Sequence, residues 1–64
     1  MFVEFTTKNK GKILINVERI AFAYMNGRHV TIELDDGTPI DVTESLDEVC
    51  SKCQVKKSKE NDKN

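Results

Sequence analysis

The sequence predicts an α+β fold: a bent antiparallel β-meander of four or five strands, one C-terminal helix and a disordered basic tail. Tight-turn signals separate short segments in which apolar residues alternate with a period of two, as in half-buried strands. After residue 44 the apolar residues recur with the 3.6 period of a helix. The 64 residues allow one domain with a small core, expected at 1–55, followed by a flexible Lys-rich tail at 56–64.

The first two strands are expected on either side of a turn at residues 9–12. Apolar residues flank Glu4 in the first segment, and residues 13–15 form a β-rich apolar run in the second. Asn16 can cap a single helical turn at 17–19, because its side-chain oxygen can accept a hydrogen bond from a backbone amide. This turn would lead directly into the third strand.

Residues 20–26 look apolar on both faces of a strand. The two expected sides are Ile20, Phe22 and Tyr24, and Ala21, Ala23 and Met25. In so short a chain, either the helix covers one side of such a strand and a second subunit the other, or one face is an exposed patch with a function. We therefore predict a homo-oligomer or a protein partner, with an interaction surface made of Ala21, Phe22, Ala23, Tyr24, Met25, Arg28 and His29.

Two hairpins are expected in the second half of the sheet. Asn26-Gly27 is expected to supply the two positive-φ positions of a two-residue turn. In the next strand the residues expected to face the core are Val30, Ile32 and Leu34, and those expected to face solvent are His29, Thr31, Glu33 and Asp35. Asp36-Gly37 marks a second turn, and Pro39 lies near the start of the returning strand.

The C-terminal helix is expected to begin at Ser45, which can form a capping box with Glu48. Its apolar stripe consists of Leu46, Val49, Cys50 and Cys53, at i, i+3, i+4 and i+7. The two cysteines have the Cys-x-x-Cys spacing of redox and zinc sites, but a redox thiol usually lies at a helix N-terminus and zinc needs two more ligands. We interpret Cys50 and Cys53 as core residues, with metal and redox chemistry as open alternatives, and expect no cofactor.

The C-terminal end is basic, whereas the body is acidic. Residues 1–49 hold five basic and nine acidic side chains, and residues 50–64 hold five and two, for a net charge of −1. Four lysines could share a helix face away from the apolar stripe and contact nucleic-acid phosphates: Lys52, Lys56, Lys59 and Lys63. The alternative interpretation is a solubilising terminus, because the acidic body opposes a polyanion.

No pattern in the sequence indicates catalysis or membrane insertion. His29 is expected to be a solvated turn histidine, and turn geometry explains Asp35 and Asp36. No run approaches the roughly 20 apolar residues of a membrane span, and the N-terminus lacks the features of a signal peptide. The chain is therefore expected to be a non-enzymatic cytoplasmic protein without membrane association.

The middle of the chain, "KILINVERI" and "VTIELDDGTPIDVTESLDEV", resembles the FlbD/SwrD-like family of small flagellar and swarming-motility proteins. The likeness covers roughly residues 12–50 and is carried by Ile15, Asn16, Ile20, Ile32, Leu34, Gly37, Val42, Glu44, Ser45, Glu48 and Val49. A weaker, fold-level likeness is to the LytTR-type DNA-binding domain. The first resemblance implies an accessory role in motility.

The function predicted from the sequence is a small binding or assembly module that acts through protein–protein contacts. A role as a motility accessory factor is what the resemblance implies. Two alternatives stay open: a nucleic-acid-binding protein that uses the lysine stripe, and a small phage-encoded inhibitor that binds a host protein or a small ligand. Steep salt dependence of DNA binding would favour the first, and co-purification with one defined host molecule the second.

Overall fold

The computed structural model describes residues 1–54 and confirms the α+β fold class. Its elements are β1 (Phe2–Thr7), β2 (Gly11–Asn16), the 3₁₀ turn η1 (Val17–Arg19), β3 (Ile20–Asn26), β4 (His29–Leu34), β5 (Pro39–Val42) and α1 (Leu46–Lys52). The predicted tail at 56–64 lies outside the described residues. Within residues 1–54, no helix has the length and apolar character that crossing a membrane requires.

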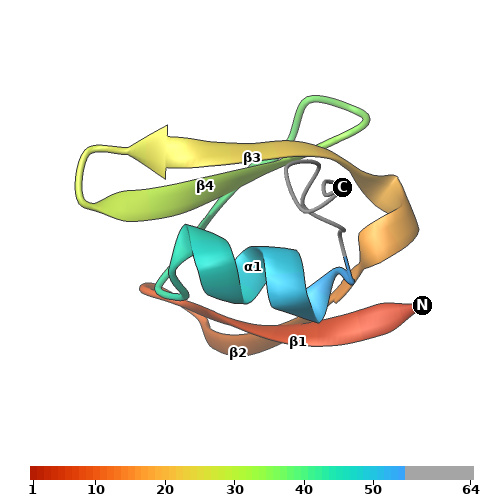
Figure 1. Ribbon diagram of the computed structural model, residues 1–64, viewed down its shortest axis with the longest axis horizontal. Helices are drawn as coiled ribbons and strands as arrows, with labels where there is room; N and C mark the ends of the chain where they lie inside the picture. Colours follow the sequence, from red (N-terminus) through yellow and green to blue (C-terminus); the bar gives the residue numbers. More distant parts are fainter. Residues whose placement is uncertain (55–64) are drawn as a thin grey trace, which may run out of the picture.

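The five strands form one antiparallel sheet in the order β2-β1-β5-β4-β3. Strands β2 and β3 are consecutive in the chain yet occupy the two edges, and η1 connects them. The β1–β5 junction is short: Thr7 pairs with Val42, and the Thr43 amide donates to the Thr6 carbonyl at 2.8 Å. Two hairpins therefore meet along a narrow seam, and α1 lies between them (Figure 1).

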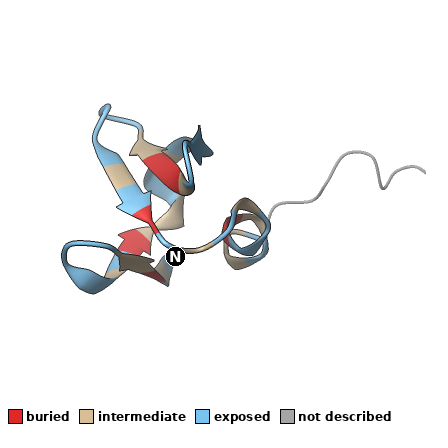
Figure 2. Cartoon of the chain, turned by 90° about the vertical axis from the view of Figure 1, so that its left-hand side faces the viewer, coloured by how far each residue is buried: buried red, intermediate tan, exposed pale blue. Residues whose placement is uncertain are grey.

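The core lies between the two hairpins and one side of α1 (Figure 2). Its six buried apolar side chains are each at most 4% exposed: Phe5, Ile15, Val30, Ile32, Val42 and Val49. These residues come from β1, β2, β4, β5 and α1, so every element except η1 and the edge strand β3 contributes at least one, and β4 contributes two. Strand β3 instead adds partly buried side chains to the margin of the core, among them Ile20 and Ala23.

Both predicted helix caps are present. The Asn16 side-chain oxygen accepts from the Glu18 amide at 3.1 Å, at the start of η1. At the start of α1, the Glu48 amide donates to Ser45 Oγ at 3.1 Å and the Ser45 amide donates to Glu48 Oε1 at 2.9 Å. This reciprocal capping box satisfies two amides that the first helical turn leaves free.

Replacing Glu48 with alanine is expected to lower the free energy of unfolding by about 0.5–1 kcal/mol, because the Ser45 amide loses its acceptor. Urea denaturation followed by circular dichroism measures this loss. Glu48→Gln is the matched control, since a glutamine at the third helical position still closes the box. Equal losses in the two variants would show that the charge of Glu48, and not its hydrogen bond, stabilises the helix.

The β3–β4 hairpin is present, but its turn is shifted by one residue from the expected position. Asn26 pairs with His29, so the two turn residues are Gly27 and Arg28, and Asn26 is the last residue of β3. Gly27 has φ +66°, whereas neither Asn26 nor Arg28 has a positive φ. A glycine at the first turn position and an ordinary residue at the second are typical of a type II′ turn.

A β-bulge in β3 changes the expected sorting of its side chains. Ile20 pairs with Leu34, but the next pair is Phe22 with Glu33, so Ala21 is the extra residue. Ile20 therefore shares the core-facing side with Leu34, while Phe22 lies on the outer face. The expectation that Ile20 and Phe22 lie on one side is wrong for this reason.

Candidate interaction surface on strand β3

Two aromatic side chains stand on the outer face of β3. Phe22 is 52% exposed and Tyr24 is 40% exposed, and their ring centroids lie 5.8 Å apart at an interplanar angle of 30°. On the neighbouring strand they are paired with Glu33 and Thr31, respectively. The two rings form an exposed aromatic pair, here called the aromatic step, directly after the bulge at Ala21.

A hydrogen-bonded network lies beside this step. Thr31 Oγ1 donates to Asp41 Oδ1 at 2.7 Å, and Asn26 Nδ2 donates to Thr31 Oγ1 at 3.2 Å. Thr31 is only 1% exposed, so the expectation that it faces solvent is wrong. The network links β3, β4 and β5, and it gives the buried hydroxyl both a donor and an acceptor.

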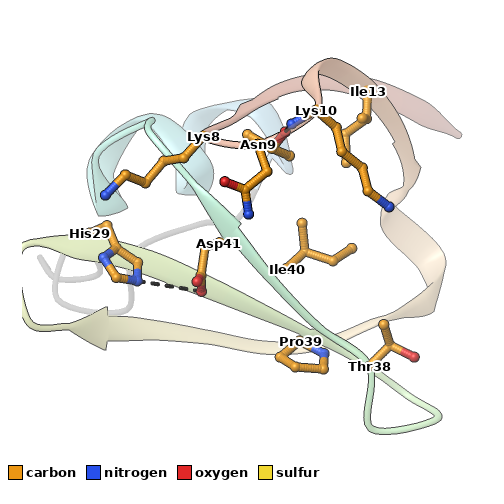
Figure 3. A pocket seen from close by; sticks show the side chains of 10 residues that line it. Lys8, Asn9, Lys10, Ile13, His29, Thr38, Pro39, Ile40 and Asp41 are labelled. Carbon is orange, nitrogen blue, oxygen red and sulfur yellow. Dashed lines mark hydrogen bonds and ion pairs between the residues drawn. The ribbon is translucent and has the colours of Figure 1, made fainter.

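His29 is partly buried, not solvated as the sequence suggested. Its side chain is 29% exposed, and Nε2 lies 3.4 Å from Asp41 Oδ1 (Figure 3). This is an ion-pair distance if the imidazole is protonated. The orientation of the ring does not allow a hydrogen bond to Asp41, and Nε2 has no other hydrogen-bond partner within residues 1–54. The carboxylate of Asp41, in β5, thus accepts a hydrogen bond from Thr31 and lies within ion-pair distance of His29, both in β4.

His29 and Asp41 border a pocket of about 560 Å³ beneath the β1–β2 loop. Lys8, Asn9 and Lys10 project from that loop around the pocket (Figure 3). The lining therefore carries ammonium groups, an imidazole and a carboxylate together. Such a mixed lining can hydrogen-bond a polar group, but it does not select a ligand of one charge.

An apolar groove of about 400 Å³ runs between β3 and α1. Its lining residues are Val17, Ile20, Ala21, Phe22, Ala23, Leu46, Val49, Cys50 and Cys53. The alanines leave room because their side chains are small, and the helix supplies larger apolar groups opposite them. Met25 lies on the same side of β3 as Ala23 but is 52% exposed.

Both cysteines are free thiols, and both are partly buried along the groove. Cys53 packs against the core, and burial, together with the nearby Cys50, raises the pKa of its thiol. Within residues 1–54, no group of three histidine, cysteine, aspartate or glutamate side chains could hold a metal ion. The thiols therefore face the groove as small apolar groups.

Replacing Cys53 with alanine is expected to cost roughly 1–2 kcal/mol at neutral pH, as for a small core truncation. The raised pKa of Cys53 also predicts a pH effect. The neutral thiol of Cys53 contributes to the free energy of unfolding in full below the ordinary pKa of a thiol. This contribution is lost as the pH rises through the raised pKa that the thiol has in the folded protein. Urea titrations from neutral to alkaline pH should show a smaller alkaline loss for Cys53→Ala than for the wild type, and equal losses would contradict this assignment.

Of the four lysines in the predicted stripe, the structure describes only Lys52. Lys52 Nζ lies 5.7 Å from the ring centroid of Phe5, so this side chain covers a core aromatic instead of standing away from the apolar stripe. The other three lysines, Lys56, Lys59 and Lys63, lie outside the described residues. Lys52 is therefore better explained by a cation–π contact than by a phosphate contact.

The backbone of β3 has an open edge. The Leu34 amide donates to Thr38, on the side of β5, and the Asp35 amide donates to the Arg19 carbonyl, on the side of β3. Along an antiparallel strand, successive residues direct their backbone N–H and C=O groups alternately to the two neighbouring sides. Counting back from Asp35, the β4 residues that bond to β3 are those paired with Phe22, Tyr24 and Asn26. The backbone groups of Phe22 and Tyr24 are therefore used in the bonds to β4. Ala23 and Met25 then direct their N–H and C=O groups outward.

Of the seven residues predicted as one surface, five lie in β3, Arg28 lies in the β3–β4 turn and His29 is the first residue of β4. Phe22 and Tyr24 are on the outer face, and Ala23 and Met25 are on the inner face near the groove. The network partner Asp41 was not predicted, because the sequence does not show which strand lies beside β4 or in what register. Comparison of the chain with protein-family models, curated proteins and solved structures found no match.

Proposed function

We propose that the protein is a non-enzymatic binding and assembly module that acts through protein–protein contacts made by β3. The observation that supports this proposal best is an edge strand of seven residues that contains no charge and no proline. Natural proteins usually protect such an edge with lysine, proline, a short length, a β-bulge or a cover, and β3 has the bulge at Ala21 near its start. The residues after the bulge, 22–26, pair regularly with β4 and present an open edge that is suited to strand addition by another chain.

The side chains of β3 support the same proposal. Phe22, Tyr24 and Met25 are 40–52% exposed, and they project from both sides of one strand. Aromatic residues and methionine are enriched at interfaces, where they supply large buried areas. The resemblance to small flagellar and swarming-motility proteins extends the proposal to an accessory role in motility.

Capture of a host protein by β3 variants tests this function. We expect the immobilised wild-type protein to retain one defined host protein, and the double variant Phe22→Ser, Tyr24→Ser to lose it. Both substitutions remove exposed rings, so the variant should keep a cooperative urea transition. That transition is measured first, to show that any loss of binding is not a loss of folding.

The matched control is Phe2→Ser, Leu14→Ser. These side chains are 65% and 66% exposed on the outer face of the other hairpin, where Phe2 pairs with Asn16 and Leu14 with Glu4. Retention by this control and loss by the β3 variant would support the proposal. Equal retention by both variants, or retention of duplex DNA in place of a protein with steep salt dependence, would overturn it.

A further inference from the structure

We propose that the partner of β3 is a second copy of this chain, with the two β3 strands pairing antiparallel about Ala23. This inference rests on the proposed function and names one partner for it. A two-fold axis at Ala23 makes the interface isologous, so each contact occurs twice. The two sheets would then continue into one another across the open edges.

The backbone groups of β3 fit this register. Ala23 and Met25 direct their N–H and C=O groups toward the open edge, as the alternation along the β3–β4 ladder requires. An axis at Ala23 places each Ala23 opposite the Ala23 of the partner subunit as a hydrogen-bonded pair. It also places Met25 of one copy opposite Ala21 of the other. Ala23 and Met25 thus enter the new ladder with backbone groups that do not bond to β4, and Ala21 lies at the bulge, where the β3–β4 ladder is interrupted.

The side chains on the inner face are complementary in size. Ala21 and Ala23 line the apolar groove of about 400 Å³ beside α1, and Met25 is the large exposed side chain on the same side of the strand. In this register, Met25 of each copy reaches the groove of the other near Ala21 and Cys53. An unbranched thioether side chain is well suited to fill an irregular apolar gap.

The outer face and the charges also match. Phe22 of one copy lies opposite Tyr24 of the other, which extends the aromatic step of each copy into a cluster of four rings. Beyond the strand ends, the β3–β4 turn of one copy, which carries Arg28, comes near the η1 turn of the other, which carries Glu18. Arg28 has no ion pair within residues 1–54, and Glu18 is 77% exposed and lies 3.6 Å from the N-terminal ammonium.

An axis at Tyr24 would also pair outward backbone groups, but it fits the side chains less well. Phe22 would lie opposite Asn26, and the turn that carries Arg28 would lie beside the start of β3 instead of the η1 turn that carries Glu18. The axis at Ala23 is therefore the one that combines aromatic, apolar and charged complementarity.

Sedimentation of the 64-residue chain tests the proposal. We expect the wild type to have the mass of two 7.3 kDa chains at tens of micromolar, and Met25→Pro to weaken the dimer at least roughly tenfold. Proline lacks the amide that the partner needs, but at this position the amide is not bonded to β4, so the fold tolerates it. Met25→Lys is the second variant, for use if the proline variant fails to fold. It keeps the backbone amide but places an ammonium group at the apolar groove of the other copy, so it should also weaken the dimer.

The matched control is Leu14→Pro on the other edge strand, β2. The Val17 amide donates to the Met1 carbonyl, so by alternation Leu14 directs its amide outward, as Met25 does. A dimer that survives Leu14→Pro and is lost in Met25→Pro supports the proposal. The reverse pattern, or a monomeric wild type, overturns it. If the wild type is monomeric but still retains a host protein through Phe22 and Tyr24, the proposed function stands and the second copy is excluded.

Charge reversal tests the register. Glu18→Arg and Arg28→Glu should each weaken the dimer about two- to fivefold, and the double variant should restore it, because the pair is reformed with opposite polarity. Dissociation constants from sedimentation at low salt measure this effect. Additive weakening in the double variant would exclude the axis at Ala23.

Discussion

Replacing Phe5 with alanine is expected to lower the free energy of unfolding by about 3–5 kcal/mol. Phe5 is 0% exposed in β1 and lies in the core cluster with residues of the other hairpin and of α1. Truncation of a buried phenylalanine costs about 3–5 kcal/mol, because it removes apolar burial and leaves a cavity. A chain of 64 residues has a total stability of roughly 3–10 kcal/mol, so this single loss removes about a third of it at the least and all of it at the lower end.

The position of Lys52 adds to this expectation. Its ammonium lies 5.7 Å from the centroid of the Phe5 ring, so the substitution also removes a cation–π contact between α1 and β1. Circular dichroism in a urea series measures the effect, either as a lower midpoint or as the absence of a folded baseline. Phe5→Ala and Cys53→Ala should be compared with the wild type at one protein concentration, since self-association would itself stabilise the fold.

Phe2→Ala is the control for Phe5→Ala, because it makes the same chemical change in the same strand. Phe2 is 65% exposed on the outer face of β1, and its truncation should change the free energy of unfolding by about 0.5 kcal/mol or less. Similar midpoints for the two variants would show that the core is not built around Phe5.

The sequence predicted those features that depend on neighbouring residues. Ser45 and Glu48 are three residues apart, and their capping box is present. Asn16 caps η1, and Asp36-Gly37 lies in a turn where hydrogen bonds from Thr38, through its hydroxyl first and its amide second, lower the pKa of Asp36. In each case the partner atoms lie within a few residues, so local patterns contain the information.

Features that depend on strand register could not be predicted from the local pattern. The extra residue at Ala21 turns Phe22 to the outer face, and nothing in the alternating run shows where the ladder slips. Thr31 looked solvent-exposed because it alternates with core residues, yet Asp41 and Asn26 bond to it from the two neighbouring strands. Alternation gives the face of a strand but not what covers that face.

The same limit applies to the candidate surface. The apolar character of residues 20–26 indicated an interaction strand, but not that this strand is an edge. Its edge position follows from the pairing of β1 with β5, which brings together residues 35 positions apart and leaves β2 and β3 at the two ends of the sheet. Such a non-local pairing depends on the whole chain.

Replacing Glu44 with alanine is expected to destabilise the protein by about 1.5–3 kcal/mol, the range for a hydrogen bond to a charged group. The Thr6 amide donates to both carboxylate oxygens of Glu44, at 3.1 and 3.0 Å, in a partly buried position. This contact spans the seam between the hairpins, where the ladder supplies only the Thr7–Val42 pair and the bond from the Thr43 amide. Without Glu44 the Thr6 amide has no protein acceptor, and the seam loses one of its few connections.

Urea denaturation measures the loss in Glu44→Ala, and hydrogen exchange at the Thr6 amide locates it. Glu4→Ala is the control, because Glu4 lies in the same strand and makes only an exposed ion pair with Lys12 at 3.5 Å, worth about 1 kcal/mol or less. Glu44→Gln should fall between the two, since the amide oxygen still accepts but carries no charge. If Glu44→Ala costs no more than Glu4→Ala and leaves Thr6 protected from exchange, the two hairpins are held together by the core alone. The seam would then be a consequence of packing, and the β2 and β3 edges would be fixed by Phe5, Val30 and Val42 instead of by this hydrogen bond.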